Sequence, residues 1–388
     1  MRVSLPIYLA FKEIWRNRLR FSLVTGIIAL ITILVLFIVA LSDGLGFGNR
    51  EYLVQLDADM LVYQQRANLL LQGSLITQDT VQALRRNPDV AAVGAIGVSD
   101  TSIVLPASNR RLRVRMLGVI PGMPGEPPIV QGRGFSRPDR SEAIIDSNIA
   151  RETKAVVGDT VTIVSREGNE EKLYTIQVVG ISTSQQFNLQ PTIFLPYQTW
   201  DLRRPQTAGG SQSGEVIFNF AAVRLRDPAQ SNVVAQQLAR SINNIQIVDI
   251  VTAYEALPGY LEQARTFELQ KWFLLVIGAL VIGGFFQIQL LQRVAQVGVL
   301  RAIGISRWLV TLTFLLQVVL ITALGIFLGA AITLGLSRLL PPSLPAVFDP
   351  TTLATTVGLL MLTGPLGSAV AIRSLLKIEP LAALRLSM

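Results

Sequence analysis

The chain has 388 residues, a formal net charge of +8, 50% hydrophobic residues and only 15% charged residues. An average soluble domain has about 25% charged residues, so this composition excludes an ordinary soluble domain, and its hydrophobicity excludes intrinsic disorder. The chain has no cysteine and no histidine. Disulfides, thiol nucleophiles, catalytic imidazoles and thiolate or imidazole metal sites are therefore excluded.

Four apolar runs without any charged residue predict membrane-spanning helices. A helix needs roughly 20 apolar residues to cross a bilayer, and the runs at 21–42, 272–292, 308–337 and 351–372 all reach that length. A cleaved signal peptide is the alternative for the first run, but that run exceeds the 7–15 apolar residues of a signal sequence. If it is retained, residues 1–20 form a helix on the cytoplasmic membrane surface.

The long segment between the first two runs, 43–271, is charged and rich in turns, and we expect it to fold outside the membrane. Alternating patterns predict strands at 90–105, 111–116, 142–146, 160–165, 174–181, 216–225 and 245–251, and helices at 77–87 and 228–243. Two β-α-β-like units near the ends predict a ferredoxin-like porter module, 43–117 and 214–271, with an inserted β-rich subdomain at 118–213. The predicted fold class is thus α-helical transmembrane with four spans plus an α+β extracytoplasmic domain.

The position of the charges predicts the orientation. Residues 43–271 hold 22 basic and 23 acidic residues, a balance of −1, which leaves 12 basic and 3 acidic residues, or +9, around the spans. Short loops rich in Lys and Arg stay in the cytoplasm. Both termini and the 293–307 loop are therefore predicted to be cytoplasmic, and the 338–350 loop external. The basic excess is explained by a lipid bilayer, without a nucleic-acid partner.

Three short motifs flank the spans on the predicted cytoplasmic side. The first runs from 10 to 20 into the first span and contains Arg16, Arg18 and Arg20. The second, QVGVLRAIGIS at 296–306, places apolar and small residues near one helical face, which suits a partner's groove. The third, KIEPLAALR at 377–385, lies within the 373–388 tail, and Pro380 fits the first turn of a short helix.

With these motifs the chain resembles the FtsX-like permease family, and within it the MacB-type permease subunits of ABC exporters. The segments 131–135, 142–146 and 157–161 are similar, in their order, to the family's periplasmic core. One departure is Gln296, where relatives usually carry Glu, so a charge pair there is in doubt. The resemblance implies that the second motif docks onto an ATPase subunit, through Val297, Gly298, Leu300, Arg301, Ala302, Gly304 and Ser306. It implies a cytoplasmic role for the third motif, with Glu379, Pro380, Ala383, Leu384 and Arg385.

The resemblance implies a non-catalytic subunit in a bacterial cytoplasmic (inner) membrane. No G-x-x-x-x-G-K-[ST] phosphate loop is present, so ATP and Mg²⁺ are expected on a separate ABC ATPase chain. The function expected is mechanotransmission: ATP hydrolysis by the partner drives export of an extracytoplasmic substrate. The resemblance also implies a second permease chain, in a homodimer or in a heterodimer with a related permease. It further implies a periplasmic adaptor protein.

Three alternatives stay open. The first is a transmembrane signal relay that activates an extracellular cell-wall hydrolase. The second is a lipoprotein-releasing permease, and the third is an enzyme with an external active site. The enzyme is poorly supported, because the adjacent Glu170 and Glu171 fall in a predicted turn, and Asp57 and Asp59 lack a metal-binding pattern around them.

Overall fold

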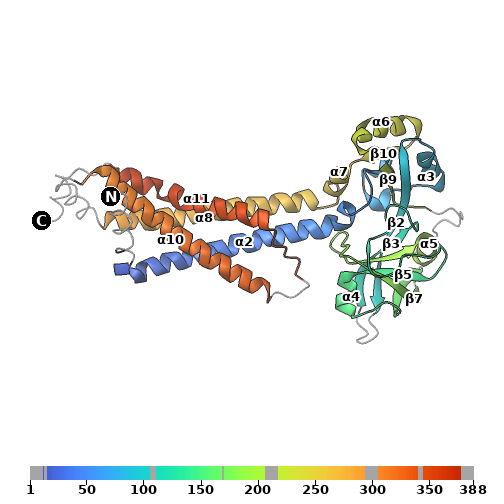
Figure 1. The fold of residues 1–388 in the computed structure, drawn as a ribbon, viewed down its shortest axis with the longest axis horizontal. Coiled ribbons are helices and arrows are strands. Elements are labelled where there is room, and N and C mark those ends of the chain that lie inside the picture. The colour runs from blue at the N-terminus through green and yellow to red at the C-terminus, as the bar shows by residue number, and fades with distance from the viewer. Residues whose placement is uncertain are drawn as a thin grey trace. The chain divides into compact units, whose positions relative to one another are not determined.

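The structure is a computed structural model that describes residues 12, 15–104, 111–167, 170–205, 217–292, 305–339 and 344–376. The chain divides into two compact units (Figure 1). The helical unit comprises Met1–Leu45 and Gln263–Met388, and the β-rich unit comprises Gly46–Glu262.

Four long apolar helices make up the described part of the helical unit: α2 (Arg18–Val54), α8 (Tyr260–Leu291), α10 (Arg307–Ser337) and α11 (Pro350–Leu376). All four are long and apolar enough to cross a membrane. They bury one face of each helix in a shared core around Phe21, Phe286 and Val318. Their outer faces carry exposed apolar residues as well, such as Leu23 and Phe327. Helices that are hydrophobic all round are typical of a lipid environment.

Helices α2 and α8 continue well beyond the uncharged runs that predicted them. α2 extends to Val54 and α8 begins at Tyr260, so each has residues in both units. The extensions carry charged residues such as Arg50 and Glu262, which end a hydropathy signal but not a helix. Backbone hydrogen bonds within a helix form equally well in lipid and in water, and Leu, Glu, Gln, Ala and Arg, which follow Tyr260, favour helix.

One part of the β-rich unit has the βαββαβ order of a ferredoxin-like fold. Its sheet has the order β10-β1-β9-β2 with every neighbour antiparallel. Helices α3 and α6 pack on the same face of this sheet, in one apolar core. Its elements are β1 (Met60–Gln64), α3 (Gln78–Arg85), β2 (Val90–Val104), β9 (Phe220–Leu225), α6 (Ser231–Ser241) and β10 (Ile245–Val248).

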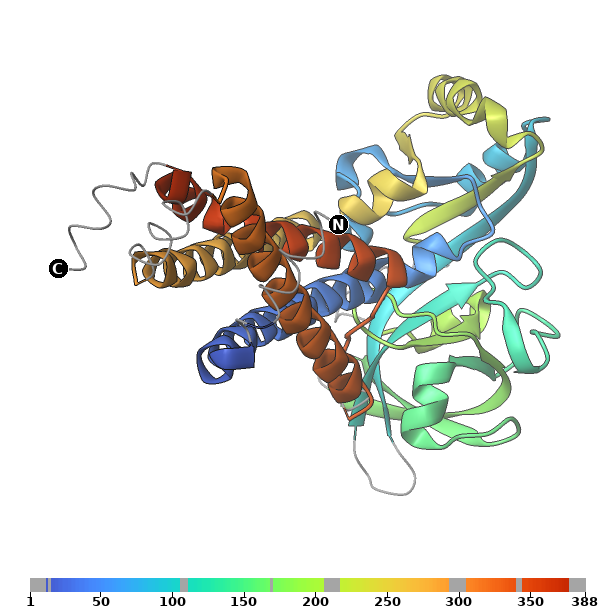
Figure 2. The ribbon, with the colours of Figure 1, turned by 60° about the vertical axis from the view of Figure 1, so that its left-hand side comes forward.

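The inserted part extends the same run of paired strands through β3, β8, β5, β7 and β4, while β6 pairs with β2 and β7. Figure 2 shows it, in cyan to green, as a second lobe of the unit. Two pairs, β3 with β8 and β5 with β7, are parallel. Its elements are β3 (Arg111–Val119), β4 (Ile129–Gly132), β5 (Glu142–Asp146), α4 (Ser147–Thr153), β6 (Thr160–Glu167), β7 (Glu170–Ser182), β8 (Thr192–Pro196) and α5 (Tyr197–Arg203).

The change from the ferredoxin-like part to the inserted part falls inside β2. β2 pairs with β9 as far as Ile96 and with β3 from Gly97, which faces Gly118. A Cβ atom at either glycine would collide with the ring of Trp200, which is 1% exposed. These two glycines leave the space in which Trp200 of α5 packs. The division into subdomains at 118 and 213 stays a prediction.

Local capping explains where predicted elements begin and end. Thr77 caps α3 as predicted, because its Oγ1 accepts a hydrogen bond from Thr80 N. The predicted strand 245–251 is wrong after Val248. Asp249 accepts a hydrogen bond from Thr252 N (3.0 Å) and starts helix α7 (Ile250–Glu255) instead. Three short 3₁₀ turns were also not predicted: η1 (Gln65–Ala67), η2 (Leu71–Gly73) and η3 (Pro228–Gln230).

Candidate functional site

Two of the three predicted interfacial arginines, Arg18 and Arg20, lie in the first turn of α2, and Arg16 lies just before it. Arg16, Arg18 and Arg20 are all exposed. The guanidinium of Arg20 donates a hydrogen bond to Gln292 Oε1 (2.8 Å), directly after the end of α8. Positive charge at a helix N-terminus opposes the helix dipole. Arg20 thus joins the start of α2 to the end of α8, and the interfacial role of Arg16, Arg18 and Arg20 stays a prediction.

Most of the predicted docking residues lie outside the described residues. This holds for Val297, Gly298, Leu300, Arg301, Ala302 and Gly304, and for Glu379, Pro380, Ala383, Leu384 and Arg385 of the C-terminal motif. Ser306 is described: it is exposed, and its Oγ accepts a hydrogen bond from Leu309 N (3.3 Å), which caps the start of α10. The docking role of these residues stays a prediction.

Glycines bring the membrane helices into backbone contact. A Cβ atom on Gly283 of α8 would collide with Gly367 of α11, and one on Gly367 would collide with Ala279. A Cβ on Gly329 of α10 would lie 2.6 Å from Ala29 O of α2. The face of α8 at Gly283 is therefore occupied by α11 of the same chain. Small residues at helix crossings are the usual means of packing in membranes.

Polar side chains inside the helical unit point into the bundle. Gln289 is 5% exposed and Gln317 is 2% exposed. Within the described residues, both amide atoms of Gln289 are buried without a hydrogen-bond partner. Buried amides in membrane bundles commonly hydrogen-bond to a neighbouring helix, and no such bond of Gln289 is present among the described residues.

The three segments that resemble the family's periplasmic core come together around β7. Gly132 on β4 has φ +85°, and a Cβ there would collide with Val179 of β7. Gly158 donates its N–H to Val178 O (2.8 Å). Arg133 and Glu142 form an ion pair at 2.7 Å, and this hydrogen bond, ahead of other causes, lowers the pKa of the Glu142 carboxyl. Sequence order alone did not show these contacts.

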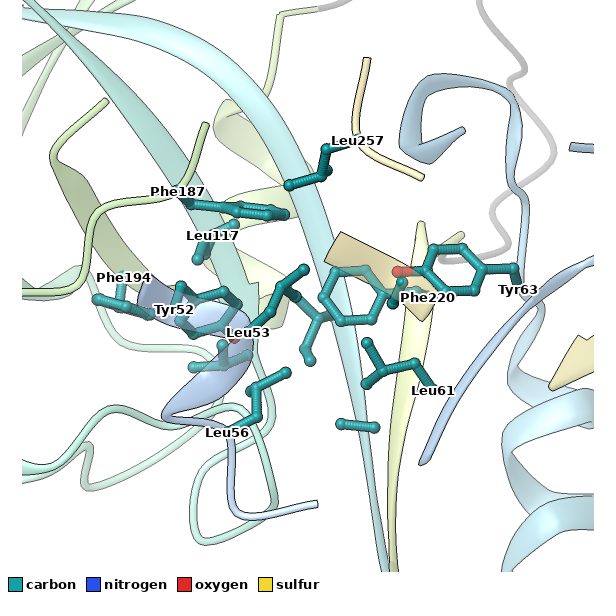
Figure 3. Packing of buried hydrophobic residues seen from close by; sticks show 14 of the residues in the cluster. Tyr52, Leu53, Leu56, Leu61, Tyr63, Leu117, Phe187, Phe194, Phe220 and Leu257 are labelled. Atoms are coloured by element: carbon teal, nitrogen blue, oxygen red, sulfur yellow. The ribbon is translucent and has the colours of Figure 1, made fainter. Parts of the chain in front are cut away.

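The last turns of α2 are buried in the β-rich unit (Figure 3). Tyr52 is 1% exposed, its ring lies 5.5 Å from that of Phe187 and 5.6 Å from that of Phe194, and its hydroxyl donates to Gly125 O (3.0 Å). Sequence reasoning missed this site. The available signal was the apolar spacing of Tyr52, Leu53 and Leu56 beyond the first charged residues.

The carboxylates considered for catalysis have structural partners. Glu171 forms an ion pair with Arg111 (2.8 Å), Asp57 pairs with Arg224, and Asp59 accepts a hydrogen bond from Leu225 N (2.7 Å). No group of three or more acidic side chains suited to a metal ion occurs among the described residues. These contacts give Glu171, Asp57 and Asp59 a role in the fold.

Two family models match the chain in succession. Residues 21–241 match the MacB-like periplasmic core domain, and residues 272–380 match the FtsX-like permease C-terminal domain. The first match alone covers more than half of the chain. The chain belongs to the MacB/FtsX-like permease family. It is therefore an ABC transporter permease with membrane helices and an extracytoplasmic domain, and the family implies an ATPase partner.

Two relatives match over nearly their whole length. A Staphylococcus haemolyticus protein is 22% identical over 382 residues, covering 97% of this chain and 98% of the relative; its name assigns it, provisionally, to a hemin transport system as the permease protein HrtB. An uncharacterized ABC transporter permease of Mycobacterium tuberculosis, Rv2563, is 24% identical over 376 residues, with 94% and 97% covered. The crystal structure of the periplasmic region of MacB from Actinobacillus actinomycetemcomitans is 14% identical, with a TM-score of 0.37, and covers 52% of this chain and 92% of that one.

Proposed function

We propose that the chain is the permease subunit of a MacB-type exporter, and that a separate ABC ATPase chain supplies the energy. The observation that carries this proposal is the succession of both family domains along one chain. ATP binding by the partner displaces the cytoplasmic segments, and α2 and α8 carry the displacement to the extracytoplasmic domain. The termini face the cytoplasm, and two copies of the chain, or this chain and a related permease, form the working unit.

The shared membership of α2 and α8 in both units supports mechanical coupling. Each is a continuous helix with residues in the helical unit and in the β-rich unit. The membrane-spanning parts carry no charged residue, which disfavours an ion or proton pathway through the helical unit. Movement of the external domain then performs the work on a substrate outside the membrane.

Hemin is the first substrate to test, because it is named for the staphylococcal relative. Haem iron is held in proteins by His, Cys, Met or Tyr. This chain has no His or Cys, but six Met and seven Tyr. Any direct iron ligand from this chain is therefore a thioether or a phenolate, and a porphyrin held only by apolar contacts is the other outcome.

Docking of the 293–307 loop onto the ATPase is the prediction that tests the proposal. The chain is co-expressed with the ATPase encoded next to it, and Leu300 and Gly304 are each changed to Asp. A charge placed in an apolar groove is expected to cost on the order of 2 kcal/mol, or about 30-fold in affinity. The measurements are co-purification of the ATPase, the rate of ATP hydrolysis in nanodiscs, and the hemin resistance of a deletion strain that carries each variant.

The same change at Leu173, an exposed residue of the β-rich unit, is the matched control and should leave the complex intact. An intact complex with full ATPase stimulation in both loop variants would contradict docking through this loop. Capture of a cell-wall hydrolase, with no export defect on deletion, would favour the signal relay. Retention of lipoproteins in the membrane after deletion would favour lipoprotein release.

A further inference from the structure

The end of α2 is joined to the loop between β7 and β8, residues 183–191, by its main chain. Three backbone hydrogen bonds connect them: Tyr52 N to Gln186 O (3.0 Å), Asn188 N to Asn49 O (3.2 Å) and Leu189 N to Gly48 O (3.1 Å). Main-chain bonds fix the distance between two segments more tightly than long side chains do. The loop is therefore attached to the helix itself.

A glycine on the helix and left-handed residues in the loop form this contact. A Cβ on Gly48 would lie 2.5 Å from Gln186 Oε1 and 3.2 Å from Leu189 Cδ2, so both loop side chains pack closely on this helical glycine. At the tip of the loop, Asn188 has φ 53° and Leu189 has φ 60°. A left-handed residue other than Gly costs about 1 kcal/mol and persists only where the surroundings hold it. Here the N–H groups of both residues donate to α2.

The buried carboxylate of Glu51 binds the loop at 183–191 to α2. Its side chain is 3% exposed, and Oε2 accepts hydrogen bonds from Ser184 Oγ (2.8 Å) and Gln186 N (2.9 Å). A carboxylate taken out of water is strongly destabilising unless such donors replace the lost hydration. If the loop moved away from α2, this carboxylate would lose both donors and would need water in their place, so the two hydrogen bonds favour the joined state.

The opposite side of the loop is held by the inserted part. Thr192 N, where the loop meets β8, donates to Asp146 Oδ2 (3.1 Å), and Asn148 Nδ2 of α4 donates to Ser184 Oγ (2.8 Å). Arg115 N of β3 donates to Pro191 O (2.9 Å). Ser184 thus lies between Glu51 of α2 and Asn148 of α4. The loop connects the end of α2 to the core of the inserted part.

We propose that Glu51 is a positioning residue that fixes the end of α2 to the inserted part, so that both move as one body during transport. This rests on the proposed function, in which α2 carries the displacement. The joint stays closed throughout the ATP cycle. Loosening it uncouples the inserted part from α2 without changing how the ATPase binds.

Spin-label distances in the full chain, reconstituted in nanodiscs with its ATPase, test the joint. The chain contains no cysteine, so pairs of introduced cysteines are labelled selectively, and dilution with unlabelled chain isolates distances within one copy. The first pair, Val54→Cys with Leu173→Cys, uses two exposed residues on either side of the joint. The second pair, Leu173→Cys with Leu366→Cys, reports movement between the inserted part and α11.

The first pair is expected to give one narrow distance that is the same with and without a non-hydrolysable ATP analogue. Glu51→Ala should lose this single narrow distance and lose hemin export, with the ATPase still bound. Glu51→Gln keeps a carbonyl oxygen for the two donors and should restore the narrow distance. Glu152→Ala, at an exposed glutamate of α4, is the matched control and should resemble the unmodified chain.

If the first-pair distance in the unmodified chain changes with the ATP analogue, α2 and the inserted part do not move as one body. If a folded Glu51→Ala variant keeps the narrow first-pair distance, in the presence or absence of ATP, Glu51 does not hold the two together. If the second-pair distance does not change with the ATP analogue, the proposed coupling is refuted. The first-pair distances of Glu51→Ala and Glu51→Gln without ATP still show whether Glu51 holds α2 to the inserted part. Fluorescence of the buried Trp200 confirms that each variant is folded.

Discussion

The single residues that the sequence offered as candidates for chemistry make contacts that stabilise the fold. Glu171, Asp57 and Asp59, which the sequence offered as possible acids for catalysis, bind Arg111, Arg224 and a backbone N–H. Arg20 was predicted as a basic residue beside the first span. Its hydrogen bond to Gln292 forms because the start of α2 lies next to the end of α8. Residue type was visible in the sequence, whereas the partner was not, because each partner is distant along the chain.

Asp146 predicts a pH-dependent stability of the β-rich unit. Burial raises the pKa of its carboxyl from 3.8 to about 6, although Ile149 N and Thr192 N donate to it. Since the folded state favours the protonated form, this group's contribution to stability is greatest below pH 3.8 and is lost as the pH rises through 6. Between pH 5 and 8 the loss amounts to about 1 kcal/mol, or a few degrees in Tm.

The measurement is thermal unfolding of the full chain in detergent, followed through the fluorescence of Trp200, which is buried while Trp15, Trp272 and Trp308 are exposed. Asp146→Asn does not titrate and should flatten the dependence on pH. An equal slope in the two proteins would show that the carboxyl is not buried as described.

At the scale of elements, the helices were predictable and their crossings were not. Hydropathy depends on neighbours in the sequence, so the four apolar runs appeared as α2, α8, α10 and α11. The choice of Gly283 and Gly367 as the crossing of α8 and α11 depends on which helices pack together. The same holds for β2, whose alternation predicted a strand but not its two sets of partners.

The α8–α11 crossing predicts a sharp difference between two glycines of α11. Gly367→Ala should destabilise the bundle by about 1–3 kcal/mol, because its Cβ would meet the backbone of Ala279. Gly358→Ala, in the same helix, has open space around the new atom and should be neutral or stabilising. Thermal aggregation in detergent, read by size-exclusion chromatography, compares them. Equal behaviour of the two variants would refute the crossing.

At the scale of the whole molecule, the family and the class of protein follow from both matches along the chain. The orientation rests on the basic residues beside the spans. Because the chain lacks cysteine, Leu173→Cys in the β-rich unit and Ser387→Cys in the C-terminal tail can each be probed alone. A membrane-impermeant maleimide should label Cys at 173 on intact cells and at 387 only after lysis. Labelling of both on intact cells would reject a cytoplasmic C-terminus.

Four properties could be predicted from the order of amino acids alone: the four spans, a separate extracytoplasmic domain, the ferredoxin-like order of elements and the resemblance to the family. These properties are carried by hydropathy, charge and short motifs, which are local along the chain. Three features became visible only in the folded chain: β2 pairs with β9 along its first part and with β3 along the rest, Gly283 faces α11, and Glu51 and Tyr52 join α2 to the loop at 183–191. Those contacts join residues many positions apart, and their stability comes from burial and hydrogen bonds that exist only once both segments are folded.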